Sequence, residues 1–171
     1  MRIAVVGTGY VGLVTSAGLA EFGNDVACVG DDEDELTRLA EGKVGIYEPG
    51  LPELVASNLK AGRIRFTTDL EQAVTKAEVV IVATSIAIDG DGDADLAPLF
   101  ALADRIGKVI DGYKVIALKS TVPVGTTDRL AVRIGAHGSI PFGVACNPAF
   151  VKEGEAVADF MKPDRIVIGT S

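Results

Sequence analysis

Three glycines at positions 1, 3 and 6 of one short segment stand almost at the start of the chain, in Gly7-Thr8-Gly9-Tyr10-Val11-Gly12. The apolar run Ile3–Val6 before them indicates a buried strand, and the residues after them have a helical pattern. In such a unit the first glycine allows a tight reversal, the second lets a pyrophosphate approach the backbone, and the third lets helix and strand pack closely. The helix N-terminus also offers N–H groups to an anion. The segment therefore predicts a dinucleotide site, with a purely structural turn as the alternative.

Composition and charge narrow the class of protein. With 171 residues, 48% of them hydrophobic, the chain can bury the core of one domain spanning residues 1–171. A net charge of −8 and only 5% aromatic residues argue against a nucleic-acid surface. No apolar stretch reaches the roughly 18 residues of a membrane span, and no signal peptide is expected. Cys28 and Cys146 are expected to be small buried hydrophobes, which favours a cytoplasmic location without disulfides.

Apolar runs that indicate strands alternate with helical patterns along the chain. Continuous apolar strands separated by helices predict an α/β fold: a doubly wound Rossmann-type parallel sheet with helices on both faces. Its binding crevice is expected at the carboxyl ends of the strands. Strands are expected at Ile3–Val6, Val26–Val29, Val79–Ala83, Lys114–Leu118, Val144–Cys146 and Ile166–Ile168, and helices at Tyr10–Phe22, Asp34–Glu41, Leu51–Ala61, Leu70–Lys76, Ala97–Ile110 and Thr126–Ile134.

Several segments also carry a family resemblance. They are the glycine turn, Ile46–Leu51 (IYEPGL), Arg65–Asp69 (RFTTD), Asp91–Leu96 (DGDADL), Lys119–Thr126 (KSTVPVGT) and Pro163–Gly169 (PDRIVIG). Together they resemble the N-terminal NAD-binding domain of the UDP-glucose 6-dehydrogenases, within the UDP-glucose/GDP-mannose dehydrogenase family. The resemblance implies NAD as cofactor and the oxidation of a sugar alcohol to a carboxylate in two steps, through a thioester on a cysteine.

The resemblance also implies which residues form the site. Cofactor contacts are expected from Gly7, Gly9, Tyr10, Val11, Gly12, Asp31, Ser85, Ile86, Thr121 and Glu153, with Thr121 as the candidate catalytic residue. The nucleophile of the family lies in a second domain, and Cys28 and Cys146 match strand positions instead. Complete sugar oxidation by this chain alone is therefore not expected. The family dimerises largely through a helix beyond this domain, which implies a monomer or weak homodimer here.

The departures from the family pattern lie near the expected ligand. A dinucleotide site uses a carboxylate after its second strand to bind the adenosine ribose. The family has aspartate there and this chain has Gly30, with Asp31 as a substitute one residue away; the lysine of the family is replaced by Glu35. Weak dinucleotide binding is expected, and Gly30→Asp is expected to strengthen it more than any other single reversion. The acidic run Asp31–Asp34 disfavours NADP, whose 2′-phosphate requires a cation.

Further departures are Ile86 in place of threonine and Ala149 in place of glutamate. Changes that converge on one crevice suggest a pocket altered by engineering or, as the less favoured alternative, by natural divergence. Three functions remain open: a weak NAD-binding domain, part of a dehydrogenase that is active only with its other domain, and a redesigned scaffold for a non-native ligand.

Other candidate sites have weaker support. The acidic segment Asp89–Asp95 superficially resembles a calcium loop, but Ala94 and Phe100 occupy the positions where an EF-hand needs glycine and glutamate. An acidic loop that caps the next helix is expected instead, and no metal site. His137 is expected to be a solvated loop residue and Lys119 to form a structural ion pair.

Overall fold

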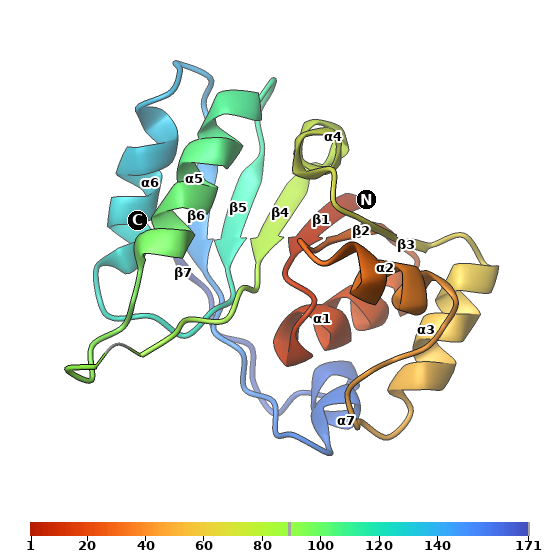
Figure 1. Cartoon of the computed structure of the whole chain (residues 1–171). Helices are drawn as coiled ribbons and strands as arrows, with labels where there is room; N and C mark the ends of the chain where they lie inside the picture. The colour runs from red at the N-terminus through yellow and green to blue at the C-terminus, as the bar shows by residue number, and fades with distance from the viewer. Residues whose placement is uncertain (89, 171) are drawn as a thin grey trace.

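The computed structural model describes residues 1–88 and 90–170. Within them one sheet has the strand order β3-β2-β1-β4-β5-β6-β7 (Figure 1). The strands are β1 (Arg2–Val6), β2 (Asp25–Val29), β3 (Ile64–Thr67), β4 (Val79–Val82), β5 (Val115–Leu118), β6 (Gly143–Cys146) and β7 (Gly169–Thr170). The helices are α1 (Tyr10–Glu21), α2 (Glu33–Ala40), α3 (Leu51–Lys60), α4 (Leu70–Lys76), α5 (Ala97–Val109), α6 (Thr126–Gly135) and α7 (Ala156–Met161).

This topology confirms the predicted doubly wound α/β fold. β1 pairs with β2 on one side and with β4 on the other, and all pairs from β3 through β6 are parallel. The winding direction therefore changes beside β1, which is where open α/β sheets bind their ligands. The last strand differs from the rest, because β7 pairs antiparallel to β6.

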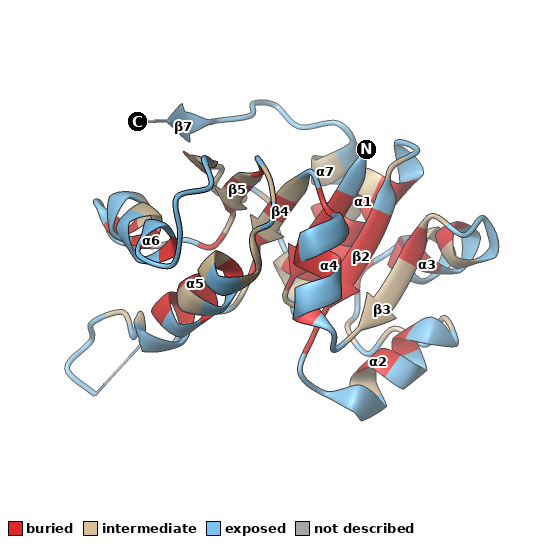
Figure 2. Ribbon diagram, turned by 90° about the horizontal axis from the view of Figure 1, so that it is seen from above, coloured by how far each residue is buried: buried red, intermediate tan, exposed pale blue. Residues whose placement is uncertain are grey.

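Helices cover both faces of the sheet, but they bury some strands more completely than others. α4, α5 and α6 share a hydrophobic core with alternate residues of the strands, such as Val6, Val82 and Leu118. On the opposite face, residues such as Val5 of β1 pack against α1. In Figure 2 β2 is mostly buried, whereas in β5, farther from α1, buried residues alternate with residues of intermediate burial. The β1–β2 half of the sheet is thus the better covered.

Three elements differ from the sequence-based prediction. β3 was not predicted, because the polar residues Arg65 and Thr67 interrupt its apolar run, as suits a strand at the edge of a sheet. α7 is a short helix and gave no periodic signal. The predicted strand Ile166–Ile168 is wrong: β7 begins only at Gly169, and Ile166 and Ile168 are exposed beyond the end of the ladder.

No described helix combines the length and the apolar character that a membrane crossing requires. Asp89, where the calcium-like segment begins, lies outside the described residues, and no cluster of potential metal-binding side chains occurs among the residues described. The N-cap residue of α5, Leu96, provides no side-chain cap, but the Asp95 carboxylate just before it accepts a hydrogen bond from Ala97 N at 3.0 Å.

Candidate functional site

The glycine turn joins β1 to α1 through three glycines with different roles. Gly7 has a φ of +123°, and a Cβ there would lie 2.5 Å from the carbonyl oxygen of Ala83. A Cβ on Gly12 would lie 2.1 Å from the carbonyl oxygen of Gly7. A side chain at either position would collide with backbone, so these two glycines are required by the close packing of strand, turn and helix.

Gly9 is different because the space above it is open. A Cβ there would meet only the Ser85 hydroxyl, at 3.5 Å. Gly9 is the N-cap of α1 and supplies no side-chain cap, and the first turn of the helix has no acidic residue. The first N–H groups of α1 therefore face this space with the positive end of the helix dipole, which is a favourable arrangement for a phosphate.

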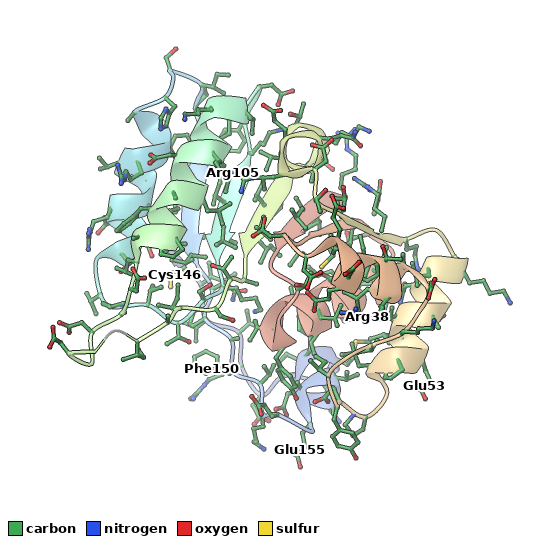
Figure 3. All side chains as sticks on the ribbon, in the orientation of Figure 1. Arg38, Glu53, Arg105, Cys146, Phe150 and Glu155 are labelled. Carbon is green, nitrogen blue, oxygen red and sulfur yellow. The ribbon has the colours of Figure 1, made fainter. Side chains whose placement is uncertain are left out.

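Two cavities flank the turn. The first, which we call the Gly30 cavity, has a volume of about 340 Å³ and lies between the ends of β1 and β2 and helix α5. Its polar lining comes from Thr8, Asp31, Thr84 and Arg105, and Arg105 extends into it from α5 (Figure 3). The remaining lining residues are Val6, Gly7, Val29, Gly30, Leu70, Pro98, Ala101 and Leu102.

The second, which we call the Thr121 cavity, has a volume of about 250 Å³ and lies where the loops after β4 and β5 meet the start of α1. It is lined by Gly9, Tyr10, Val11, Ala83, Thr84, Ser85, Ile86, Lys119, Ser120, Thr121 and Ala149. The structure thus brings together six predicted site residues around one cavity, and it places Gly7 and Asp31 in the other. Gly12 lies beneath the turn, whereas Glu153 is exposed and lines neither cavity.

Thr84 lines both cavities, immediately after β4. Its backbone oxygen accepts a hydrogen bond from the Ser120 hydroxyl at 2.6 Å, which fixes the loop. Its own hydroxyl is buried and has no hydrogen-bond partner among the described residues. Since a buried hydroxyl without a partner is costly, Thr84 marks the point between the cavities where a polar ligand group would be stabilising.

The side chains beside Gly30 change what can be expected of the substitution Gly30→Asp. The Thr8 hydroxyl donates a hydrogen bond of 2.8 Å to Glu35 Oε2, and in this rotamer Thr8 Cγ2 would lie 2.6 Å from a Cβ on Gly30. The side chain of Thr8 therefore occupies the space that an aspartate at position 30 requires. Gly30→Asp would have to displace Thr8 and cannot be the simple gain that the sequence suggested.

A buried hydrogen-bond network fixes the other side of the turn. The Glu48 side chain, 3% exposed, accepts a hydrogen bond from the Tyr10 hydroxyl, and its two oxygens accept from Gly154 N at 2.8 Å and Val157 N at 3.1 Å. Gly154 N also donates to the Tyr10 hydroxyl oxygen at 2.7 Å. The network ties α1 to the segment that leads into α7.

The ionisation of this network follows from its contacts. Burial alone would raise the pKa of Glu48, but the hydrogen bonds from Tyr10 and from the backbone amides of Val157, Gly154 and Ala156 outweigh burial and lower it. Burial and the hydrogen bond to Glu48 raise the pKa of Tyr10 to about 12. Sequence reasoning gave Glu48 no role. The available signal was a glutamate directly before Pro49-Gly50, within a segment that was used only for its family resemblance.

Lys119 does not form the ion pair that was predicted for it. Its ammonium donates to Asn147 Oδ1 at 3.2 Å, and no carboxylate pairs with it within the described residues. Because Lys119 is half-buried, burial lowers its pKa. A lysine of this kind at the edge of a cavity can bind or exchange a proton with a ligand oxygen.

Three other side chains were also predicted from the sequence. His137 is an exposed loop residue, as predicted, and its Nε2 in addition lies 3.0 Å from Asp104 Oδ1. Cys28 is buried as predicted, and burial raises its pKa to about 12. Cys146 was also predicted to be buried but is only partly so, because it ends β6 where the sheet is covered less (Figure 3).

A third cavity, which we call the Phe150 cavity, has a volume of about 240 Å³ on the face of the sheet that carries α1. Its lining is mainly apolar, with Phe22, Phe150, Phe160 and Ile166 among its residues. It contains neither the glycine turn nor the N-terminus of α1, so it lacks the groups that would bind a pyrophosphate.

The glycine turn, the open N-terminus of α1 and two cavities on either side of the switch point define a dinucleotide-binding Rossmann domain. Comparison with known proteins makes this class specific. The chain belongs to the UDP-glucose/GDP-mannose dehydrogenase family: the model of the NAD-binding domain of that family matches residues 1–171. NAD is therefore the cofactor. The open space above Gly9 fits such a ligand, and so does the Thr84 hydroxyl, which has no partner among the described residues.

Relatives and solved structures agree with this assignment. Over 99% of this chain, it is 46% identical to a UDP-glucose 6-dehydrogenase of Rhizobium meliloti strain 1021. Over the full length of this chain, it is 43% identical to a UDP-glucose 6-dehydrogenase of Pseudomonas aeruginosa. It spans 39% of each of these relatives. It superposes with a TM-score of 0.95 and 38% identity on a UDP-glucose dehydrogenase from Pyrobaculum islandicum, covering 99% of this chain and 40% of that one. It superposes on a GDP-mannose dehydrogenase of Pseudomonas aeruginosa, solved as a ternary complex, with a TM-score of 0.93 and 31% identity. That superposition covers 100% of this chain and 41% of the other chain.

Proposed function

We propose that this chain is the NAD-binding part of a nucleotide-sugar 6-dehydrogenase, and that NAD lies across the glycine turn with its adenosine in the Gly30 cavity and its nicotinamide in the Thr121 cavity. One observation carries this proposal: the two cavities meet at the turn and share Thr84. The pyrophosphate then lies above Gly9 at the N-terminus of α1, where nothing but the Ser85 hydroxyl approaches.

The residues of the Thr121 cavity have distinct proposed roles. Bound NAD supplies the chemistry by accepting a hydride from the alcohol carbon of the substrate. The hydroxyl groups of Ser85 and Thr121 orient the nicotinamide, and Thr121 is the candidate to contact the reacting oxygen. The lowered pKa of Lys119 suits it to hold a proton near that oxygen. Ile86 excludes water from the same cavity and offers no hydrogen bond.

We further propose that the chain does not complete the oxidation by itself. A thioester step requires a reactive thiolate beside the nicotinamide. Cys28 is buried in β2 with a pKa raised to about 12, and Cys146 lines neither the Gly30 cavity nor the Thr121 cavity. The nucleophile must then come from another part of the enzyme. Formation of NADH from UDP-glucose and NAD by the purified 171-residue chain would contradict this.

The experiment that tests NAD binding is calorimetric titration of the chain with NAD. Without a carboxylate at residue 30, the ribose lacks one or two charge-assisted hydrogen bonds worth about 1.5–3 kcal/mol each. We expect a dissociation constant between about 10 µM and 1 mM. A constant below 10 µM contradicts the proposed weakness, and the absence of heat at 1 mM NAD contradicts the assignment of the site.

A redesigned or diverged pocket for another ligand is the second candidate function. It is favoured by Ile86 and Ala149, which line one cavity together with Ser85. Gly30 lines the other cavity, so the changes do not converge on a single pocket. Native mass spectrometry of freshly purified protein separates the two candidates: a co-purifying dinucleotide supports the first, and a different bound molecule supports the second.

A further inference from the structure

The Gly30 cavity needs a carboxylate for the adenosine ribose, and β2 ends without one. Two carboxylates lie nearby. Asp31 lines the cavity but is exposed and makes no ion pair or hydrogen bond among the described residues. Glu35, in the first turn of α2, is partly buried and is held by the Thr8 hydroxyl at 2.8 Å. A carboxylate that is fixed before a ligand arrives loses less entropy on binding than an exposed, mobile one.

The local structure explains why Glu35 points toward the turn. The Asp32 carboxylate caps α2 by accepting hydrogen bonds from Asp34 N at 2.9 Å and from Glu35 N at 3.0 Å. This cap fixes the first turn of α2 at the end of β2, and the side chain of Glu35 reaches back to Thr8. Thr8 itself lies between Gly7 and Gly9 and lines the Gly30 cavity. Glu35 is not itself a lining residue of the cavity, but its hydrogen bond to Thr8 brings a carboxylate from a helix next to a side chain that is.

We propose that Glu35, oriented by Thr8, is the carboxylate that binds the adenosine ribose and that selects NAD over NADP in this chain. The inference rests on the NAD site proposed above. Glu35 Oε2 accepts from Thr8, and Oε1 has no hydrogen-bond partner within the described residues and is the oxygen left for a ribose hydroxyl. One such acceptor in place of two agrees with weak NAD binding. A 2′-phosphate would face Glu35, Asp31 and the acidic first turn of α2, which opposes NADP.

The lining of the Gly30 cavity also supports the opposite preference, for NADP, because Arg105 is one of its residues. A guanidinium there could bind a 2′-phosphate and favour NADP. The comparison of NAD with NADP is therefore part of the test, and tighter binding of NADP than of NAD by the parent chain overturns the proposal.

The central experiment compares Glu35→Gln with Glu33→Gln by calorimetry on the 171-residue chain, with NAD as the probe. Both changes remove one negative charge from the first turn of α2, but Glu33 is exposed, and the hydrogen bond from Thr8 goes to Glu35. We expect Glu35→Gln to weaken NAD binding about tenfold and Glu33→Gln less than twofold. Equal effects of the two, or a larger loss for Asp31→Asn than for Glu35→Gln, overturn the proposal.

A second arm tests whether Glu35 acts on the ribose. For an NAD analogue whose adenosine ribose lacks both hydroxyls, Glu35→Gln should change affinity less than twofold. A tenfold loss with that analogue means that the carboxylate acts through general charge or through the fold, and this overturns the proposal. Circular dichroism and thermal unfolding of each variant establish that the fold is retained.

A compensating pair completes the test. With Glu35→Lys, Thr8 is released and can rotate away from Gly30, so the double variant Gly30→Asp/Glu35→Lys should bind NAD at least as tightly as the parent. Gly30→Asp alone must displace Thr8 beside a retained Glu35, and we expect no gain. A tenfold gain for Gly30→Asp alone overturns the role of the Thr8–Glu35 pair. If the parent and every variant fail to bind NAD at 1 mM, the proposed NAD site fails as well; if the parent binds and Glu35→Gln matches Glu33→Gln, only the role of Glu35 fails.

Discussion

The two sides of the glycine turn are built in different ways. Toward α7, Tyr10 and Glu48 form a buried network with backbone amides in which hydrogen-bond donors and acceptors are paired. Toward α2, the exposed carboxylate of Asp31 lines a cavity, and one hydrogen bond, from Thr8 to Glu35, connects the first turn of α2 to the glycine turn. The first side fixes the position of the turn and the second is left open for a ligand. Substitutions on the first side should therefore change stability, and those on the second should change affinity.

The largest effect is expected for Gly12→Ala. Its Cβ would lie 2.1 Å from the carbonyl oxygen of Gly7, which is backbone and cannot move aside without displacing α1 from β1. We expect a loss of about 3 kcal/mol or more in the free energy of unfolding, measured by urea titration. Gly9→Ala is the control, since its Cβ would meet only the Ser85 hydroxyl at 3.5 Å. Equal stabilities of the two variants would show that the turn is not packed as described.

The next largest effect is expected for Glu48→Ala. The substitution removes the acceptor of hydrogen bonds from the Tyr10 hydroxyl, Gly154 N and Val157 N. Val157 N loses its side-chain acceptor, while Tyr10 keeps only its longer hydrogen bond of 3.2 Å to the Lys152 carbonyl oxygen. We expect a destabilisation of about 2–4 kcal/mol in chemical denaturation. Tyr10→Phe, which removes one partner and keeps the ring, should cost about 1–2 kcal/mol. If Tyr10→Phe costs as much as Glu48→Ala, the network is not centred on Glu48.

The same network predicts a pH dependence. Because the folded pKa of Glu48 lies below its ordinary value of 4.5, the charged form stabilises the folded state above that value. This contribution is lost as the pH falls through the lowered pKa. The stability of the parent should therefore decline more steeply with acid than that of Glu48→Gln between about pH 5 and pH 3. Parallel curves for the two proteins in thermal unfolding would show that the carboxylate is not specifically stabilised.

On the open side of the turn, Gly9→Ala should weaken NAD binding at nearly unchanged stability. The added methyl group occupies the space above the N-terminus of α1 where the proposed pyrophosphate approaches. We expect a loss of affinity of tenfold or more, about 1.4 kcal/mol, by calorimetry. Unchanged affinity would place the pyrophosphate elsewhere.

How much of this could be predicted from the sequence depends on whether the signal was local. The glycine spacing predicted the turn, and the apolar runs predicted the strands of the parallel sheet, because the pattern of apolar residues along a segment reflects which of its side chains are buried. The roles of Glu48 and Glu35 were not predictable, since each depends on a partner distant in the sequence: Gly154 and Val157 for Glu48, and Thr8 for Glu35. β3 was missed because its edge position admits polar residues, and the predicted effect of Gly30→Asp had to be revised because Thr8 fills the required space.

The smallest effect is expected for Ile86→Thr in the Thr121 cavity. A neutral hydroxyl adds about 0.5–1.5 kcal/mol when it finds a partner. Ile86 also packs against the core formed by α4, α5 and α6, so part of this gain is offset by lost apolar contact. We expect NAD affinity to rise less than threefold. A tenfold gain would mean that Ile86 blocks the cofactor and does not merely lack a hydrogen bond.

Amide chemical-shift mapping with NAD can establish whether one dinucleotide spans both cavities across the glycine turn. Saturating NAD should shift the backbone signals of Gly9 and Val11 in the turn, of Gly30 and Asp31 in one cavity, and of Ser85 and Thr121 in the other. Shifts confined to residues of the Phe150 cavity, such as Phe150 and Ile166, with the turn unchanged, would contradict this placement of NAD.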